Sequence, residues 1–358
     1  MPSSPGGESR SANEAPVTDE SVVVDLPIRG TVPRSLSGRY LRIGEGLVHA
    51  VGLAGGRAPS YSCRSIPADA TNVVSFGSSM LAFADGALAY EIGPGLDAVR
   101  RVDLAGARRS LTAHPRIDPV TGELHLVTFA PSPSQLHVTV SPGGLTRTIR
   151  SIENAPSGIR QLEVAGDEVV FLADGYVGVA GRTGVDAKAA WFAIDTDARN
   201  IAAAETRAES VLVYTIGPSL ERRTLRRGAK TVDREVLDAG PCALATSNPR
   251  PPHGVHRFLW TAGAGSVHKH DLETGSGRSH ELGGGRDSST LTFVADPDRS
   301  GDADGGWLVG FAHDEAGNEA DFVVLDAQAV ERPAVAVMRL PRRMPARGHG
   351  TWVPAPQI

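Results

Sequence analysis

Short β-rich runs joined by tight-turn sequences recur along the whole chain, and helical periodicity is almost absent. In RIDPVTGELHLVTF, Asp118 opens a turn and Gly122 supplies the positive φ of a hairpin, and in VHKHDLETGSGRSHEL Gly275 takes the same place. Asp-Gly pairs that begin at Asp85 and Asp174 lie between alternating apolar residues, which is the strongest short-range hairpin signal. The chain is therefore predicted to be all-β and built from hairpins.

These hairpins group into units of similar length. Strands that would open a unit recur at intervals of 40, 47, 40, 54, 39 and 57 residues, and about 40–50 residues make one four-stranded propeller blade. The spacing predicts a seven-bladed β-propeller, with N-terminal VVVDLPIRG and GRYLRIG completing the last blade so that no sheet edge stays free. A stack of open sandwiches is the alternative. The predicted opening strands begin near Thr71, Leu111, Gly158, Ala198, Pro252, Leu291 and Gly348.

Composition narrows the class of protein. The net charge of −5 gives no reason to expect a nucleic-acid partner. The two cysteines, Cys63 and Cys242, form no disulfide framework, which favours the reduced cytoplasm. No run of 18 apolar residues occurs, so no transmembrane segment is expected, and only weak peripheral contact with a membrane stays open. Residues 1–20 are predicted to be a disordered tail and residues 21–358 a single propeller domain.

Six stretches, in order along residues 26–354, together resemble the carotenoid cleavage oxygenase family. LPIRGTVPRSLSGRYLRIG resembles its N-terminal signature, GLVHAVGLAGGRAPSYSCR the segment that follows, and LTAHPRIDPVTGEL the segment that carries its first iron histidine. HKHDLETG, ADFVVLDA and RLPRRMPARGHGTWVP resemble its C-terminal third. The resemblance implies a seven-bladed propeller that holds Fe(II) on its axis with four histidines, one from each of four blades. It also implies oxidative cleavage of a carbon–carbon double bond in an apolar polyene or stilbene-like substrate.

The resemblance places two of the four iron histidines in this chain. His114 in AHPRIDP matches the first ligand, and His349 in GHGTW matches the fourth. No histidine occurs between His137 and His253, so the second and third ligands are missing. The chain therefore keeps half of the family's ligand set.

Other residues stand where the missing ligands are expected. Counting back from Phe171 places Arg160 on the second ligand. A gapless count places Ile201 on the third, and a two-residue deletion places Arg199 there.

The resemblance also implies three glutamates that support the iron histidines from behind, and other residues stand in their places here. Asp85 stands in place of the first, Ala243 aligns roughly with the second, and Thr290 aligns with the third. Carboxylates behind metal-binding imidazoles fix their tautomer and orientation. Losing two ligands and two supporting carboxylates together indicates that the site no longer holds iron as the family does.

Arg160 sharpens this interpretation, because a guanidinium is always charged and cannot ligate a metal. Near the axis it would repel Fe(II). We expect Arg160 to replace part of the metal's charge, either by pairing with Asp85 or by binding a carboxylate, enolate or carbonyl oxygen of a ligand. The alternative is that it points outward or bonds only a backbone carbonyl.

A reduced iron site is a further alternative, since two histidines and one carboxylate are enough for non-haem iron. His114 and His349 would then recruit Asp85, Glu163 or Asp197.

The chain is short for the family. Material is missing after LRIGEG and after SYSCRSIP, where the family builds a dome over the top face of the propeller. A reduced dome implies a more open channel and a small apolar metabolite, such as a polyene, terpenoid, polyketide or stilbene, in place of a long carotenoid.

Three functions follow from these observations. The first is a non-oxygenase tailoring reaction such as cyclisation or isomerisation, with Arg160, Asp85, His114 and His349 as acid–base and oxyanion groups and no cofactor. The second is an Fe(II) dioxygenase with an altered ligand set. The third is a non-catalytic binding protein that kept the scaffold.

Overall fold

The computed structural model describes most of the chain from Glu20 onward. The predicted tail, apart from Glu20, lies outside the described residues. Those residues are 20–66, 70–106, 108–129, 135–144, 147–156, 158–183, 188–195, 197–229, 231–240, 242–251, 254–263, 265–283, 285–288, 291–314, 319–344 and 348–355.

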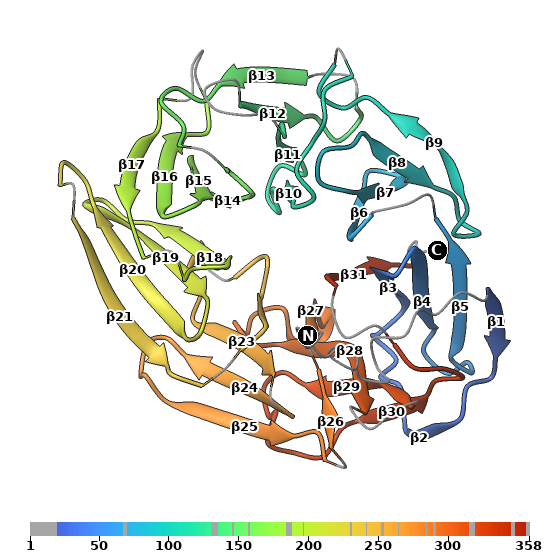
Figure 1. Cartoon of the computed structure of the whole chain (residues 1–358). Helices are drawn as coiled ribbons and strands as arrows, with labels where there is room; N and C mark the ends of the chain where they lie inside the picture. Colours follow the sequence, from blue (N-terminus) through green and yellow to red (C-terminus); the bar gives the residue numbers. More distant parts are fainter. Residues whose placement is uncertain are drawn as a thin grey trace, which may run out of the picture.

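Seven antiparallel sheets stand around a common axis as the blades of a propeller (Figure 1). Five of them are four-stranded meanders in chain order. The strands are β6 (Asn72–Phe76), β7 (Ser79–Phe83), β8 (Ala89–Ile92) and β9 (Ala98–Val102); β10 (Arg116–Ile117), β11 (Leu124–Val127), β12 (Leu136–Val140) and β13 (Arg147–Ser151); β14 (Gln161–Ala165), β15 (Glu168–Ala173), β16 (Tyr176–Gly181) and β17 (Ala190–Ala193); β18 (Asn200–Thr206), β19 (Ser210–Ile216), β20 (Leu220–Arg226) and β21 (Val232–Asp238); and β22 (Leu244–Ser247), β23 (Phe258–Gly263), β24 (Ser266–Asp271) and β25 (Gly277–Glu281).

Two larger sheets close the ring by joining both ends of the chain. One has the order β1-β5-β4-β3-β31, and the other has β2-β30-β29-β28-β26, with β27 also paired to β28. A short 3-10 turn, η3 (Pro297–Arg299), lies between β27 and β28. The strands are β1 (Ser21–Val24), β2 (Ile28–Gly30), β3 (Gly38–Gly44), β4 (Leu47–Leu53), β5 (Ser60–Ser65), β26 (Arg286–Asp287), β27 (Leu291–Ala295), β28 (Gly306–Asp314), β29 (Ala320–Asp326), β30 (Ala336–Arg339) and β31 (Gly350–Pro354).

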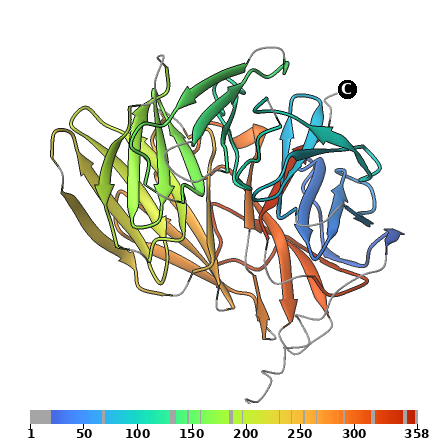
Figure 2. The ribbon, with the colours of Figure 1, turned by 45° about the horizontal axis from the view of Figure 1, so that its top comes forward.

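The predicted seven-bladed propeller is confirmed, and so is its closure. GRYLRIG forms β3, which pairs along its length with the C-terminal strand β31. VVVDLPIRG divides between two blades: β1 edges the blade that contains β31, and β2 pairs with β30 in the neighbouring blade. The division falls at Asp25, whose φ of 63° turns the chain just before Pro27. The two ends of the chain thus hold two adjacent blades together (Figure 2).

The predicted opening strands agree with the structure at most positions. β27 begins at Leu291 as expected, and β6, β14, β18 and β31 begin within three residues of their predicted starts. Leu111 makes only isolated bridges, so β10 begins at Arg116. The start near Pro252 is wrong because the inner strand of that blade is β22, which begins at Leu244; Pro252 itself lies outside the described residues.

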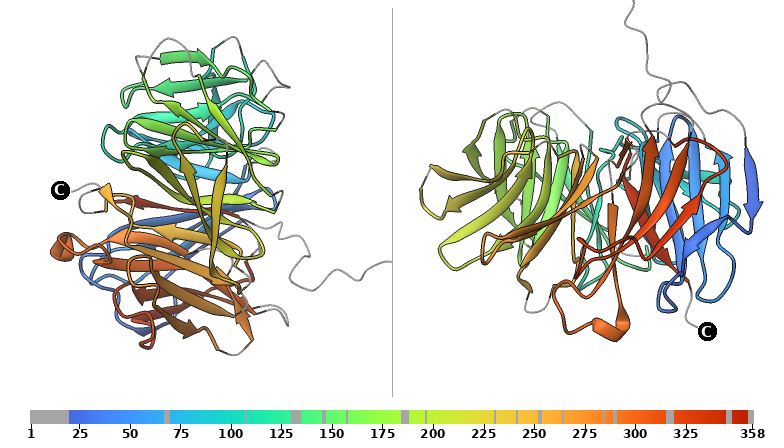
Figure 3. Two further views of the ribbon diagram at one scale, coloured as in Figure 1. Left: turned by 90° about the vertical axis from the view of Figure 1, so that its left-hand side faces the viewer. Right: turned by 90° about the horizontal axis from the view of Figure 1, so that it is seen from below.

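Every inner strand runs in the same direction along the axis. Four antiparallel strands return the chain to the face of the ring where the blade began, so the next inner strand starts from that face again. Figure 3 shows the blades edge-on, with the strands running between the two faces of the ring. Residues that precede the inner strands therefore gather at one face, and residues that follow them gather at the other.

The apolar core lies between neighbouring blades. One cluster, for example, packs Val170 and Phe192 of one blade against Ile201 and Val213 of the next. Burial of such side chains stabilises the ring by roughly 1.5–3 kcal/mol each, before conformational entropy is subtracted. In the part of the chain that the structure describes, no helix is long and apolar enough to cross a membrane.

The chain makes a tight turn at the end of LRIGEG, one of the two places where the insertions that build the family's dome are expected to be missing. β3 and β4 are joined by Glu45 and Gly46 alone, with φ angles of 54° and 77°. Two positive φ angles in a two-residue loop suit the twist of the flanking strands.

Candidate functional site

Two histidines from different blades meet near the axis of the ring. His114 lies two residues before β10 and His349 one residue before β31, and the blade of β6–β9 stands between their two blades. Their ring centroids are 4.9 Å apart, with the ring planes at 73°. The structure thus brings together the two histidines that the sequence singled out.

Both imidazoles are held in the neutral form. Burial lowers the pKa of His349 to about 3, with further lowering by His114, Arg116 and Arg42. Burial also lowers the pKa of His114, which Arg116 and Arg160 lower further and Asp85 opposes. Near neutral pH each ring therefore offers one N–H donor and one acceptor nitrogen.

Arg116 is a member of this site that the sequence reasoning did not single out. It lies two residues after His114, and residues two apart on an extended strand point to the same side. Its Nε donates to Glu163 at 2.8 Å across the gap between β10 and β14. The spacing from His114 was the signal that could have identified it.

Arg160 lies just before β14, and its expected pairing with Asp85 is wrong. Its guanidinium pairs with Asp174, in the turn between β15 and β16, and donates to the Ala198 carbonyl at 2.5 Å. Asp85 instead accepts a hydrogen bond from the Ala113 backbone N–H at 2.6 Å. Asp174 reaches Arg160 because the β14–β15 pairing brings the turn after β15 beside the start of β14.

The two candidate positions for the third ligand differ in their surroundings. Ile201 is 2% exposed and packs in the apolar cluster between blades, whereas Arg199 is exposed. The buried Gln161 side chain accepts from the Ile201 N–H at 2.8 Å and donates to its carbonyl at 3.2 Å. Of the two residues, Arg199 is thus the one that the apolar core does not enclose.

The side chains present do not fit an iron site. Within the described ranges no carboxylate joins His114 and His349 in a group of three metal-binding side chains whose ligand atoms lie within 4.8 Å of one another. Glu163 is engaged by Arg116, and Asp197 is exposed. Non-haem iron needs at least two histidines and a carboxylate, so the donor set falls short of the smallest one.

Of the second and third supporting-glutamate positions the structure describes only Ala243, which offers no replacement ligand. Ala243 has no donor side chain, and its backbone N–H bonds the Ala262 carbonyl. Thr290 lies outside the described residues.

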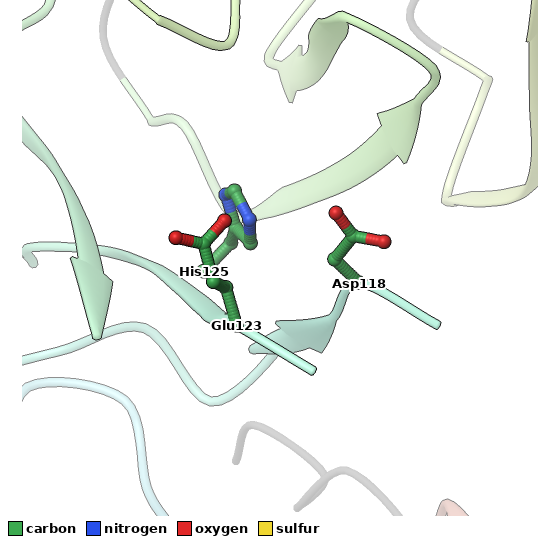
Figure 4. Close-up of side chains that lie close together, drawn as sticks. All are labelled: Asp118, Glu123 and His125. Atoms are coloured by element: carbon green, nitrogen blue, oxygen red, sulfur yellow. The ribbon is translucent and has the colours of Figure 1, made fainter. Parts of the chain in front are cut away.

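A different cluster has the composition of a metal site. Ligand atoms of Asp118, Glu123 and His125 lie within 4.8 Å of one another beside β10 and β11 (Figure 4). The Asp118 carboxylate already has partners, because it forms an ion pair with Arg182 and accepts a hydrogen bond from the Val120 backbone N–H. The Arg182 guanidinium supplies the positive charge that a cation would bring.

Hydrogen-bond direction also disfavours a cation at this cluster. Arg150 donates to Nδ1 of His137 at 2.6 Å, so neutral His137 carries its proton on Nε2 and points it at Nδ1 of His125, 3.1 Å away. His125 then carries its own proton on Nε2, the remaining ring nitrogen. That nitrogen has no lone pair to give to a metal.

Comparison with known proteins relates the whole chain to one family. The family model described as Retinal pigment epithelial membrane protein matches residues 62–161 and 184–354. A carotenoid cleavage oxygenase of Mycobacterium tuberculosis is 25% identical over 486 aligned residues, covering 95% of this chain and 96% of the relative. A probable carotenoid cleavage dioxygenase of Arabidopsis thaliana is 24% identical, covering 96% of this chain and 80% of the relative. Both alignments are longer than this chain, so the relatives contain segments without a counterpart here.

Solved structures agree with the fold. Cobalt-substituted apocarotenoid oxygenase of Synechocystis superposes with a TM-score of 0.83 at 18% identity, covering 96% of this chain and 98% of that one. A chimera of that oxygenase with the retinal pigment epithelial protein gives a TM-score of 0.85 at 16% identity, covering 97% of this chain and 100% of the chimera.

Proposed function

The chain belongs to the retinal pigment epithelial membrane protein and carotenoid cleavage oxygenase family, and from that premise we propose that it catalyses a non-oxygenase reaction on a small apolar metabolite. The reaction class is isomerisation or cyclisation, driven by proton transfer at the axial histidines. The observation that carries the proposal is the contact between two neutral imidazoles, at 4.9 Å between centroids, without a third ligand for iron in the described residues.

The pair of histidines suits acid–base chemistry. One neutral imidazole accepts a proton through its free nitrogen while the other donates one through its N–H. Their contact couples them, since a proton taken up by His349 disfavours a second proton on His114. The pair therefore moves one proton at a time, as an isomerisation needs.

Arginine supplies the complementary charge. Arg116 lies close enough to lower the pKa values of both histidines, and its guanidinium forms an ion pair with Glu163. An enolate or carbonyl oxygen that gains negative charge during proton transfer is stabilised by such a donor. Arg160, which pairs with Asp174, contributes charge from further away.

The size of the substrate follows from the shortened chain. The two-residue turn at Glu45 and Gly46 leaves no insertion there to cover the ring, and a small metabolite needs less cover than a long carotenoid. Neither Cys63 nor Cys242 forms a disulfide, which suits a cytoplasmic protein.

The test separates three outcomes on one preparation. The protein is incubated with a panel of small polyenes and apocarotenoids while oxygen uptake and products are followed together. We expect a product of unchanged mass without oxygen uptake, abolished in His114→Ala and His349→Ala and kept in His280→Ala, a variant on the outer strand β25. Cleavage products formed with matching oxygen uptake would contradict the proposal. Binding without turnover would favour the non-catalytic alternative.

A further inference from the structure

A cavity of about 660 Å³ opens at the face of the ring opposite the axial histidines. Its walls come from Val120 in the turn after β10, Ala165 at the end of β14, Thr206 at the end of β18 and the segment after β22. His114 and His349 precede their inner strands. Because all inner strands run in the same direction, the cavity and the histidine pair lie at opposite ends of the axis.

An ion pair stands between the two ends. Arg116 acts on the pKa values of His114 and His349, whereas its partner Glu163 acts on the pKa of His256, which lines the cavity. The Arg116–Glu163 contact is 2.8 Å long. Neither axial histidine lines the cavity, so the cavity is a space of its own.

The buried charges of the walls are already matched, because Asp118 pairs with Arg182 and Glu205 pairs with Arg207. Asp167 and Arg250 line the cavity from exposed positions. A charged ligand group that enters the buried part would have to displace one of the paired side chains, whereas an uncharged one would not. The apolar lining includes Pro119, Val120, Val164, Ala204, Pro249 and Pro251.

Two polar groups in the wall offer hydrogen bonds to a ligand. The Glu205 side chain is 4% exposed and accepts from the His256 backbone N–H at 2.9 Å. Burial raises the pKa of Glu205 against the opposing effects of the His256 N–H and Arg207, so this carboxyl takes up a proton more readily than an exposed one and can then donate to a ligand oxygen. Nδ1 of His256 is buried and has no hydrogen-bond partner in the described part of the chain. An apolar pocket with a few convergent polar groups is the usual form of a small-molecule site.

We propose that this cavity is a second binding site, for a small uncharged and largely apolar molecule that carries a carbonyl or hydroxyl oxygen. The ligand's carbon skeleton packs against the prolines and valines, and its oxygen bonds at Glu205 and His256. The site does not depend on the reaction at the axial histidines.

Three probes of one shape and different charge test the ligand class. They are 4-phenylbutan-2-one, 3-phenylpropanoate and protonated 4-phenylbutan-2-amine, titrated against the full chain by ligand-observed NMR. We expect the neutral ketone to bind about tenfold more tightly than either ion, because each ion would compete with an existing pair. Equal affinity for all three probes would overturn the neutral-ligand class.

Matched variants test the location. Val120→Trp fills the cavity from a side chain that is 88% exposed, so folding is preserved, and Val99→Trp makes the same change on the outer strand β9. We expect Val120→Trp to weaken ketone binding about tenfold and Val99→Trp to leave it unchanged. Unchanged binding in Val120→Trp, or loss of binding in His114→Ala, would place the probe elsewhere and refute the site.

The carboxyl is tested separately. Glu205→Leu should weaken ketone binding about tenfold, and Glu205→Gln, which keeps a donor, should stay within about threefold of the parent. If Glu205→Leu fails to fold, the Val120 and Val99 pair decides the question. Binding is measured without turnover, so its result does not depend on whether the axial site is catalytic.

Discussion

The buried His49 makes the fold sensitive to mild acid, and the size of the effect follows from its surroundings. His49 is fully buried, and its Nδ1 lies 2.9 Å from the Tyr61 hydroxyl. Burial lowers its pKa to about 3, with further lowering by Arg42 and Arg342. The unfolded chain takes up a proton near pH 6.5, whereas the folded protein does not until pH falls to about 3. Stability contributed by neutral His49 is therefore full above pH 6.5 and is lost progressively as pH falls toward 3.

The expected magnitude is large enough to measure. Between about pH 7.5 and about pH 5, this single group lowers the free energy of unfolding by about 2 kcal/mol. His49→Gln removes the titration and keeps a polar partner for Tyr61. Urea unfolding of both proteins at both pH values gives a double difference from which the cost of the substitution itself cancels. We expect the variant to lose about 2 kcal/mol less than the parent on acidification.

Equal losses in the two proteins would mean that His49 has the same pKa in the folded and the unfolded chain, against the expectation. Burial also lowers the pKa of His125 to about 4 and that of His137 well below its usual value, so the parent should show further acid sensitivity that His49→Gln leaves in place.

Two substitutions test contacts that position the inner strands. Gln161→Leu leaves the N–H and carbonyl of Ile201 without their side-chain partner and should cost about 2–4 kcal/mol in urea unfolding, whereas no change would mean that this contact is not formed. Gly350→Ala places a methyl group within 1.9 Å of the buried Tyr40 hydroxyl. We therefore expect β31 to pack poorly against β3 and the C-terminus to be cleaved faster in limited proteolysis. An unchanged cleavage rate would contradict closure of the ring by β31.

Much of the fold could be predicted because its determinants are local. Gly122 and Gly175 have φ angles of 74° and 72° in the hairpins where turn residues predicted them. The blade spacing then follows from counting. The predicted start near Pro252 is wrong because proline has no N–H for a sheet, and the inner strand of that blade begins earlier, at Leu244.

The site was harder to predict because its contacts depend on the packing of neighbouring blades and on strand register. The sequence located His114 and His349, and their meeting followed from the propeller. The partner of Arg160 depends on strand register, which places Asp174 within reach and leaves Asp85 bonded to Ala113. Register cannot be read from the residue types alone, since a shift of one residue changes every neighbour.

The metal content of the protein shows whether the axial histidines work without iron. The protein is incubated anaerobically with Fe(II), freed of unbound metal, and analysed for iron, alongside His114→Ala and His349→Ala. We expect a stoichiometry near zero in all three proteins, because two histidines without a third ligand do not retain iron. About one iron per chain in the parent, lost in both variants, would mean that His114 and His349 hold iron and would favour the oxygenase function.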